Sequence, residues 1–578
     1  MSDRRAAAAV RAALARGDLL SAYDLARQRH VGDSPNLDYL EVLTLARLGD
    51  NQRALRLYQG YGLGAREDMD ALSLRARLLK DAGFSGRGGP DMAMLREACT
   101  LYASVYRRTR DAYPAINVAT LALIVGRARL ASQMARAAAR QVVADPEPGY
   151  YTLATLAEAR LVLGDMIGAR VALEAAMAAP DADVGKRSTT VLQLQRLLHT
   201  TGGGVEAEAI LDLIRPPSVA TYRGHIFLGD PAMEQRLAAK VRAALEAETV
   251  GFAYGSLAAG SDILVAEQLL AMGAELHVVL PVTEADFLAQ SVAPAGEAWL
   301  NRYAACRAAA TSVTFASSMS HVGGQGQFAY GSTVAMGMAR LRARHLNSGA
   351  LQLALLEADS GSGLARSDVV AWNATGGRSL VIETEPLARP TMPRPTMTAD
   401  VARGTYGLMF TDFPGFARLD ERVLPLFQQE VMARAAASLQ RHSASILHKN
   451  TWGDALYVVF NNVLSGAEAA LDLCDGFRDV DTQKLGLRQG QAMRIALHYG
   501  PTYYGVEPVT ERTTFYGSEV ARAARIEPVT PPGSVYVTEP FAAILEMEPS
   551  HDFACDYVGQ VELPKGYGTF PLYRLRRG

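Results

Sequence analysis

Several features are scarce in this 578-residue chain, and each absence excludes a class of protein. Its four cysteines, Cys99, Cys306, Cys474 and Cys555, show neither a CxxC pair nor the spacing of metal ligands. This pattern excludes a disulfide-stapled secreted scaffold and predicts reduced thiols. No run of about 18 apolar residues occurs, and the first ten residues lack the apolar core of a secretory signal. We therefore expect a cytoplasmic protein without a membrane span.

Charge of either sign is also not in excess, because 58 basic and 60 acidic residues leave a net charge of −2. A strongly basic surface, the usual mark of nucleic-acid or anionic-membrane binding, is therefore not expected. The content of 49% hydrophobic, 20% charged and 7% aromatic residues is ordinary for globular proteins. A chain of this length is typical of about three or four domains.

Residues 1–213 are rich in alanine and leucine, with helical periodicity and almost no strand signal. A phrase recurs loosely as Leu-Ala-Arg-Leu-Gly-Asp at 45–50, Leu-Ala-Leu-Ile-Val-Gly at 121–126 and Ala-Arg-Leu-Val-Leu-Gly-Asp at 159–165. Such spacing predicts helix–turn–helix repeats of about 34–40 residues. The region resembles a divergent tetratricopeptide array, which implies a concave surface for a protein partner. An irregular helical scaffold without a ligand is the alternative.

Residues 214–385 alternate between strand-like and helical segments, which predicts an α/β domain of Rossmann type with a parallel sheet. The predicted strands are residues 225–228, 250–254, 275–280, 312–315, 351–356 and 378–382. A proline-rich stretch at 386–404 follows, and we expect it to be an extended, semi-rigid linker.

Two small-residue loops of this middle domain, at 255–262 and 360–368, each run from a strand into a helix. Such loops let backbone amides approach a phosphate, although tight strand-to-helix turns need glycine even without a ligand. The runs 259–267 and 273–281 resemble the SLOG group of Rossmann-like nucleotide sensors, which implies a nucleotide-derived ligand. The implied loop contacts are Gly255, Ser256, Gly260, Ser261, Asp262, Gly361 and Gly363. Glu267 could instead hydrolyse an N-glycosidic bond, but the PGGxGTxxE form of such enzymes is missing.

Two aspartates near the C-terminus carry the most chemistry: Asp412 in Phe-Thr-Asp-Phe-Pro-Gly-Phe and Asp454 in Thr-Trp-Gly-Asp. Each borders an apolar, β-rich stretch, so we expect both carboxylates at adjacent strand ends. Two carboxylates on rigid backbone can hold a pair of Mg²⁺ or Mn²⁺ ions, which neutralise the charge of a nucleoside triphosphate. The alternative is that both motifs are merely turns, since aspartate and glycine are common turn formers.

The order of motifs over residues 407–574 resembles the class III nucleotide cyclase catalytic domain. The resemblance implies an α+β, ferredoxin-like domain, which we place at 405–578. It implies that Asp412 and Asp454 bind two metal ions and that Arg525 stabilises the transition state at the α-phosphate. The implied substrate-binding residues are Arg494 and Lys565 at the triphosphate, Asn450 and Thr514 at the base, and Phe413, Gly415 and Phe416 in the loop after Asp412.

The chain departs from this family's pattern in two places. Ala521 stands where an asparagine usually orients the ribose, and the loss of one such polar group typically costs about 10²–10³ in rate. We therefore expect a slow enzyme, or compensation by Ser518 or Glu519. Asn450 and Thr514 replace the family's lysine and aspartate at the base, and their donors and acceptors exclude neither a purine nor a pyrimidine.

In this family the site lies between two cyclase domains. One domain with both halves of the site implies a head-to-tail homodimer with two equivalent sites. The predicted function is a nucleotidyl cyclase that makes a 3′,5′-cyclic monophosphate under control of the N-terminal domains, by analogy in a stress or anti-phage response. One alternative is a catalytically weak or dead pseudo-cyclase that binds nucleotide or dimerises. Another is a nucleotide-processing middle domain regulated by the cyclase-like domain.

Overall fold

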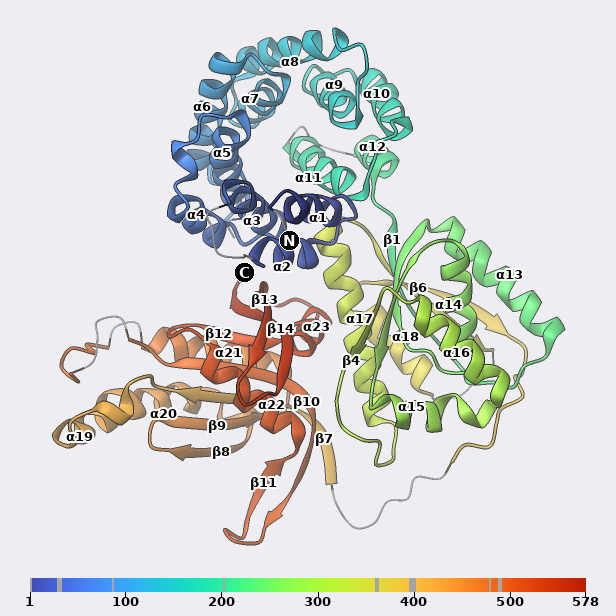
Figure 1. The fold of residues 1–578 in the computed structure, drawn as a ribbon, viewed down its shortest axis with the longest axis vertical. Coiled ribbons are helices and arrows are strands. Elements are labelled where there is room, and N and C mark those ends of the chain that lie inside the picture. Colours follow the sequence, from blue (N-terminus) through green and yellow to red (C-terminus); the bar gives the residue numbers. More distant parts are fainter. Residues whose placement is uncertain are drawn as a thin grey trace. The chain divides into compact units, whose positions relative to one another are not determined.

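The computed structural model describes residues 3–28, 34–85, 88–200, 202, 204–358, 363–393, 402–477, 480–486 and 491–578. The chain forms two compact units (Figure 1). The first unit comprises Met1–Pro216 with Arg344–Ser348, and the second comprises Pro217–Ala343 with Gly349–Gly578.

The first unit is helical, as the sequence predicts. Its helices are α1 (Asp3–Ala15), α2 (Leu19–Arg27), α3 (Pro35–Leu48), α4 (Asn51–Gly60), α5 (Met69–Phe84), α6 (Met92–Thr109), α7 (Ala112–Ile124), α8 (Ala128–Val143), α9 (Tyr150–Val162), α10 (Met166–Ala178), α11 (Val184–Thr200) and α12 (Val205–Ile214). Several of them start after an aspartate whose carboxylate accepts a backbone N–H, such as Asp165 ahead of α10. Gly49 ends α3 in the left-handed region, with φ +89°. These local signals set the helix boundaries.

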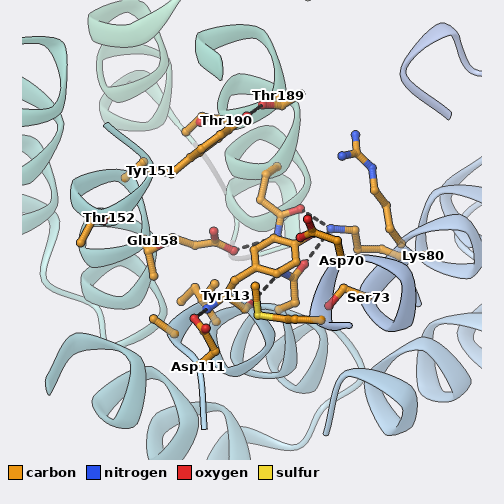
Figure 2. Close-up of a pocket in the computed structure, with 18 of the residues that line it drawn as sticks. Asp70, Ser73, Lys80, Asp111, Tyr113, Tyr151, Thr152, Glu158, Thr189 and Thr190 are labelled. Atoms are coloured by element: carbon orange, nitrogen blue, oxygen red, sulfur yellow. Dashed lines mark hydrogen bonds between the residues drawn. The ribbon is translucent and has the colours of Figure 1, made fainter. Parts of the chain in front are cut away.

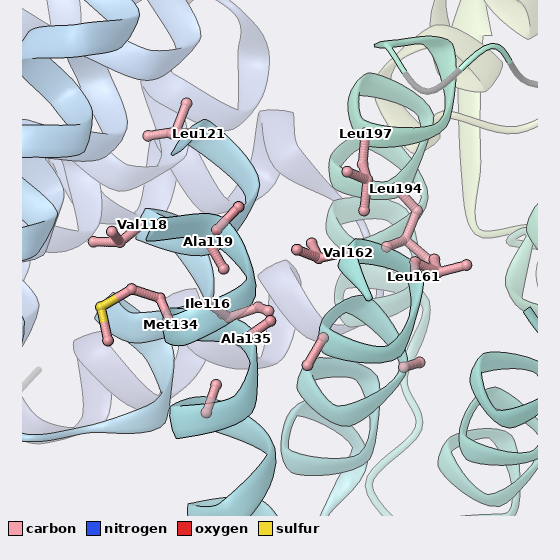
Figure 3. Packing of buried hydrophobic residues seen from close by; sticks show 14 of the residues in the cluster. Ile116, Val118, Ala119, Leu121, Met134, Ala135, Leu161, Val162, Leu194 and Leu197 are labelled. Atoms are coloured by element: carbon pink, nitrogen blue, oxygen red, sulfur yellow. The ribbon is translucent and has the colours of Figure 1, made fainter. Parts of the chain in front are cut away.

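Successive helices of this array pack side by side, and the array curves until α1 contacts α11 (Figure 1). Gly185 permits this closure, because a Cβ there would lie 1.9 Å from the carbonyl oxygen of Leu14. Apolar side chains from α7, α8, α9 and α11 fill one part of the interior, among them Ile116, Leu161 and Leu194 (Figure 3). Burial of each such side chain stabilises the fold by about 1.5–3 kcal/mol.

The second unit begins with a six-stranded parallel sheet in the order β4-β3-β2-β1-β5-β6, which confirms the predicted α/β class. Its elements are β1 (Ser218–Gly224), α13 (Pro231–Ala247), β2 (Val250–Gly255), α14 (Ser261–Ala271), β3 (Glu275–Leu280), α15 (Glu284–Ser291), α16 (Glu297–Ala309), β4 (Ser312–Phe315), α17 (Gly326–Leu346), β5 (Ala350–Glu357), α18 (Leu364–Ala374) and β6 (Arg378–Thr384). Alternate residues of β5 face opposite helix layers, since Leu353 packs in a cluster with α13, α14 and α16 whereas Ala354 packs against α18.

One predicted strand, residues 225–228, is wrong. The first strand ends at Gly224, and Phe227 follows it in a loop. The Phe227 ring is fully buried against Trp299 at a centroid distance of 5.7 Å. Phe227 therefore covers the core from a loop, and a short apolar run in the sequence does not distinguish such a loop from a strand.

A mixed sheet follows in the order β13-β14-β12-β10-β7-β9-β8, with β11 paired to β10. Its elements are β7 (Ala402–Asp412), α19 (Leu424–Phe427), α20 (Ala433–Gln440), β8 (Ile446–Trp452), β9 (Ala455–Phe460), α21 (Val463–Gly476), β10 (Arg494–Glu507), β11 (Arg512–Tyr516), α22 (Ser518–Ile526), β12 (Val535–Thr538), α23 (Glu539–Glu546), β13 (Phe553–Leu563) and β14 (Gly568–Arg577). This confirms the predicted α+β class. The strand β7 starts inside the segment expected as linker, because its pairing with β10 extends to Ala402; residues 394–401 of that segment lie outside the described residues.

The parallel-sheet and mixed-sheet parts of the second unit are packed together through α17. A Cβ at Gly337 in α17 would lie 1.9 Å from the carbonyl oxygen of Ala543 in α23. The Tyr330 hydroxyl donates to the carbonyl oxygen of Tyr499 at 2.7 Å. Glycine is therefore required where the two helices approach most closely.

Candidate functional site

The two predicted metal aspartates lie side by side at one end of the mixed sheet. Asp412 is the last residue of β7, and Asp454 lies in the two-residue turn between β8 and β9. Because β7 pairs with β9 through Thr411 and Leu456, the next positions along the sheet bring both carboxylates together. The turn needs Gly453 with φ +64°, and the Asp454 Oδ2 accepts the backbone N–H of Phe413 at 3.1 Å. The turn and the carboxylate pair, which the sequence analysis treated as alternatives, thus occur together in the same residues.

The charged form of this pair is disfavoured in the absence of a cation. Burial, reinforced by the negative charge of Asp412, raises the pKa of the Asp454 carboxyl to about 6. Carboxylate oxygens are the ligands that Mg²⁺ and Mn²⁺ prefer, so the two residues fit a divalent-metal site. Within the described ranges, no group of three or more His, Cys, Asp and Glu residues is arranged to hold a metal.

Arg494 is the neighbour of Asp412 across the sheet, since the two residues are directly paired between β10 and β7. Its Nε and Nη2 donate to the Asp412 Oδ2 at 3.0 and 2.5 Å. This fork holds the carboxylate in place and puts positive charge beside it, where a triphosphate would carry negative charge.

Sequence reasoning missed Glu527, which forms an ion pair with Arg494. It lies in a short 3-10 turn, Glu527–Val529, two residues after Arg525. Burial, opposed by Arg494 and reinforced by Asp412, raises the pKa of Glu527 to about 7. In the sequence, only the position of Glu527 directly after the Arg525 motif could have pointed to it. Its contact with Arg494 depends on how α22 packs against the sheet, which the sequence does not show.

The loop after Asp412 offers backbone rather than side chains. The Phe413 ring is 1% exposed and packs edge-on against Phe427 at 5.4 Å, while its N–H is bound to Asp454. Gly415 adopts φ +96°, and the Phe416 ring also packs on Phe427, at 4.8 Å. The aromatic residues of the loop thus anchor the strand end that carries Asp412.

The other predicted substrate residues lie on separate elements of the same sheet. Asn450 is exposed on β8, Thr514 is half-buried on β11, and Arg525 is half-buried in the last turn of α22. Lys565 is exposed in the turn between β13 and β14. In the part of the chain that the structure describes, no hydrogen bond or ion pair joins Arg525 or Lys565 to Asp412 or Asp454.

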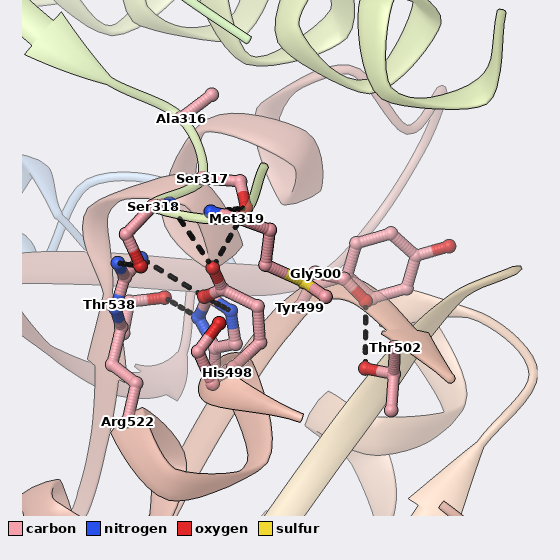
Figure 4. A network of polar contacts seen from close by, with 12 residues as sticks. Ala316, Ser317, Ser318, Met319, His498, Tyr499, Gly500, Thr502, Arg522 and Thr538 are labelled. Carbon is pink, nitrogen blue, oxygen red and sulfur yellow. Dashed lines mark hydrogen bonds and ion pairs between the residues drawn. The ribbon is translucent and has the colours of Figure 1, made fainter. Parts of the chain in front are cut away.

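The helix α22 is held by a buried polar network (Figure 4). The Glu519 side chain is fully buried, and its Oε2 lies 2.9 Å from His498 Nε2 and 3.0 Å from Arg522 Nη1. Its Oε1 accepts from the Ser317 hydroxyl at 2.8 Å, and the Arg522 Nη2 donates to Ser318 at 3.0 Å. Both serines belong to the loop that follows β4 of the parallel sheet.

These contacts occupy Glu519 fully, so the expectation that it could replace the missing asparagine near Ala521 is wrong. The carboxylate points to the interior because it balances buried Arg522, which a sequence pattern does not reveal. Ser518 begins α22, and its carbonyl accepts the Tyr567 hydroxyl at 3.0 Å.

The predicted ligand loops of the parallel sheet lie at the carboxyl ends of β2 and β5. Gly255 ends β2, Gly260 precedes α14, and Gly363 precedes α18, whereas Gly361 lies outside the described residues. A Cβ at Gly255 would lie 2.5 Å from the Tyr222 ring, and one at Gly260 would lie 2.6 Å from Phe227. Close packing alone therefore requires glycine at both positions.

Several polar side chains at these loops are paired, whereas the buried Ser261 hydroxyl has no hydrogen-bond partner among the described residues. Ser256 Oγ donates to Asp262 Oδ2 at 2.5 Å, and Arg223 Nε lies 3.5 Å from Asp368 Oδ2. Ser261 is buried beside Asp262. The cavity between Arg223, Ser256 and Asp368 measures about 10 Å³, the space of one water molecule. A nucleotide would require this cluster to open.

The comparisons with known proteins agree with both ends of the sequence analysis. Residues 401–577 match the model of the adenylate and guanylate cyclase catalytic domain, and residues 17–122 match the Tetratricopeptide Repeats-Sensor model. The chain thus has an N-terminal tetratricopeptide repeat-sensor domain and a C-terminal cyclase catalytic domain. No significant match was found among curated proteins.

Solved structures similar to the chain include the adenylyl cyclase CyaB from P. aeruginosa. It has 16% sequence identity and a TM-score of 0.27, over 31% of this chain and 97% of that one. The guanylate cyclase domain of RhGC from Catenaria anguillulae has 19% identity and a TM-score of 0.26, over 30% and 96%. No helix among the described residues is both long and apolar enough to cross a membrane.

Proposed function

We propose that the chain is a nucleotidyl cyclase, which converts a nucleoside triphosphate into a 3′,5′-cyclic monophosphate and pyrophosphate. The observation that carries this proposal is the pair of carboxylates, Asp412 and Asp454, held side by side at strand ends next to Arg494. In the reaction the ribose 3′-hydroxyl attacks the α-phosphorus, loses its proton, and the bond to the pyrophosphate oxygen breaks.

In this proposal the acidic residues bind the metal ions and the basic residues bind the phosphates. Asp412 and Asp454 would hold two Mg²⁺ or Mn²⁺ ions, which supply the positive charge that activates the 3′-hydroxyl and neutralises the triphosphate. Arg494, which donates to Asp412, would bind phosphate oxygens. Arg525 would stabilise charge at the α-phosphate through its planar guanidinium, and Lys565 would bind the terminal phosphates.

The proposed active form is a head-to-tail homodimer. It is supported by the resemblance to cyclases whose site lies between two domains, because one chain here carries both Asp412 and Arg525, and pairing of two chains would bring one half of each site from each chain. A mixture of equal amounts of Asp454→Ala and Arg525→Ala chains tests this. Half of the dimers would then be mixed, each with one intact site of two, so about a quarter of wild-type activity should return. No recovery would contradict shared sites.

The principal test is incubation of purified chain with ATP, GTP, CTP or UTP and Mn²⁺, with cyclic products detected by mass spectrometry. A product that disappears in Asp454→Ala but remains in Asp481→Ala, an exposed aspartate in a turn, supports the cyclase and identifies its base. No product from any triphosphate would favour a pseudo-cyclase, the reading that Ala521 supports. We also propose that the N-terminal domains regulate the cyclase, that the middle domain binds a nucleotide-derived ligand, and that the protein is cytoplasmic. The cyclase assay does not test these three proposals.

A further inference from the structure

The helical array of the first unit contains a cavity of about 750 Å³, well inside the usual range of small-molecule sites (Figure 2). Alternate helices α3, α5, α7, α9 and α11 supply most of its walls. Because α1 contacts α11, the concave side of the array is closed into a ring. A closed concave side suits a small molecule better than the protein segment expected from the sequence.

The walls of this cavity are polar where helix packing alone would favour apolar side chains. On α5, Ser73, Arg77 and Lys80 follow one another at helical spacing and all line the cavity. Charged groups inside a protein lower stability unless they are paired, so their placement here needs a reason beyond folding.

Two cations of the cavity lack a carboxylate partner among the described residues. Lys80 Nζ donates only to neutral amide oxygens, of Asn117 at 2.8 Å and of Gln193 at 2.9 Å. Arg47 on α3 has a buried Nε without any partner in the described structure. Burial lowers the pKa of Lys80 to about 8 and also lowers the pKa of Arg47. Burial therefore disfavours both charges, and an anion in the cavity would stabilise them.

Asp81 and Glu158, two acidic residues of the cavity wall, do not supply that anion. Asp81 is bound by Arg196 at 2.6 Å and by Arg77 at 3.4 Å. Glu158 accepts from Thr120 at 2.5 Å. Burial raises the pKa of Glu158, which favours its neutral form. Asp81 and Glu158 are thus engaged or partly neutral. Asp70, Asp111 and Asp145 also line the cavity, but within the described residues none of them forms an ion pair with Arg47 or Lys80.

Tyrosine side chains and a hydroxyl complete the lining. Tyr113 and Tyr151 are 39% and 44% exposed, yet both line the cavity, so part of what they are exposed to is its interior. The Ser73 hydroxyl on α5 also lines the cavity, and it is buried without a hydrogen-bond partner in the described residues (Figure 2). Tyrosine faces are suited to stacking on a planar ring.

We propose that this cavity binds a phosphorylated small molecule with a planar ring, the chemistry of a mononucleotide. Arg47 and Lys80 bind its anionic group, and the rings of Tyr113 and Tyr151 contact its planar part. This site is distinct from the cyclase site, and it adds a ligand-binding function to the proposed catalytic one. It does not depend on whether the cyclase is active.

The test is calorimetric titration of the full chain in EDTA with AMP, GMP, CMP, UMP, their 3′,5′-cyclic forms and NAD. EDTA removes the metal ions on which triphosphate binding at Asp412 and Asp454 would depend. We expect at least one probe to bind once per chain. Arg47→Gln and Lys80→Met should each weaken its binding at least about tenfold. Arg136→Gln, at an exposed arginine of α8 outside the cavity, is the matched control and should bind like wild type.

Hydrogen exchange of the same samples locates the ligand. The proposal expects slower exchange in α5, α7 and α9 when the probe is bound. It is overturned if no probe binds at about 1 mM, if both variants bind like Arg136→Gln, or if protection is confined to residues 402–578. Arg47→Gln removes no ion pair, so it remains a valid test if Lys80→Met fails to fold.

Discussion

Replacement of Glu519 by glutamine tests whether the buried network of α22 joins the two parts of the second unit. Burial pushes the pKa of this carboxyl upward, but His498, Arg522 and Ser317 outweigh burial and hold it at about 2. The ordinary value is 4.5, so the difference corresponds to about 3 kcal/mol of stability. A neutral glutamine also leaves Arg522, which is 5% exposed, without its counter-charge. Loss of one partner of a buried ion pair typically costs about 3–5 kcal/mol.

The pH dependence follows from the sign of the shift. Because the folded pKa of Glu519 lies below its unfolded value, its contribution is fully present above pH 4.5 and is lost as the pH falls towards 2. We expect Glu519→Gln to melt at least about 5 °C below wild type. This gap should shrink below about pH 4.5.

Scanning calorimetry measures the gap, and hydrogen exchange shows where it arises. Exchange should accelerate both in the loop 316–319 and in α22, because Ser317 and Glu519 bind each other across the two parts. A double-mutant cycle with Ser317→Ala should give a coupling energy of about 1 kcal/mol. Glu511→Gln, at an exposed glutamate, is the control. Equal melting of Glu519→Gln and Glu511→Gln would refute the reasoning.

Three further predictions concern the same unit. Asp454→Asn should stabilise the fold more at pH 8 than at pH 5, with a difference of about 1–2 kcal/mol in the free energy of unfolding, because the raised pKa of Asp454 costs stability as the pH rises. Calorimetry at both pH values measures the two gains, and equal gains would contradict the prediction. Gly337→Ala should lower stability by about 1–3 kcal/mol despite better helix propensity, because the Cβ meets Ala543, whereas Gly476→Ala in open space should not; thermal melts compare the two. Ala521→Asn should raise the rate of cyclic product formation at least about tenfold if the missing asparagine limits catalysis, and an unchanged rate would point to another limiting step.

Much of the fold could be predicted because its signals are local. The strand predictions at 275–280 and 312–315 coincide with β3 and β4, where apolar runs sit between turn residues. The wrong strand prediction at 225–228 has the same origin, since a loop that buries an aromatic side chain shows the same apolar run as a strand.

The site was predictable in part for a similar reason. Asp412 and Asp454 each lie within a short motif, and adjacent strand ends were sufficient to expect them together. Glu527 was missed, and Glu519 was assigned the wrong role, because the partners of both, Arg494 and Ser317, are distant in the sequence.

The sequence by itself determined the helices, most strands and the two aspartates, because periodicity, caps and turns act over a few residues. Only the tertiary structure decided the cavity of the helical array, whose walls come from residues between Tyr39 and Arg196. It also decided that Glu519 is a buried partner of Ser317. Contacts between distant segments depend on how complete elements pack, and burial then determines which charges are paired and which remain available to a ligand.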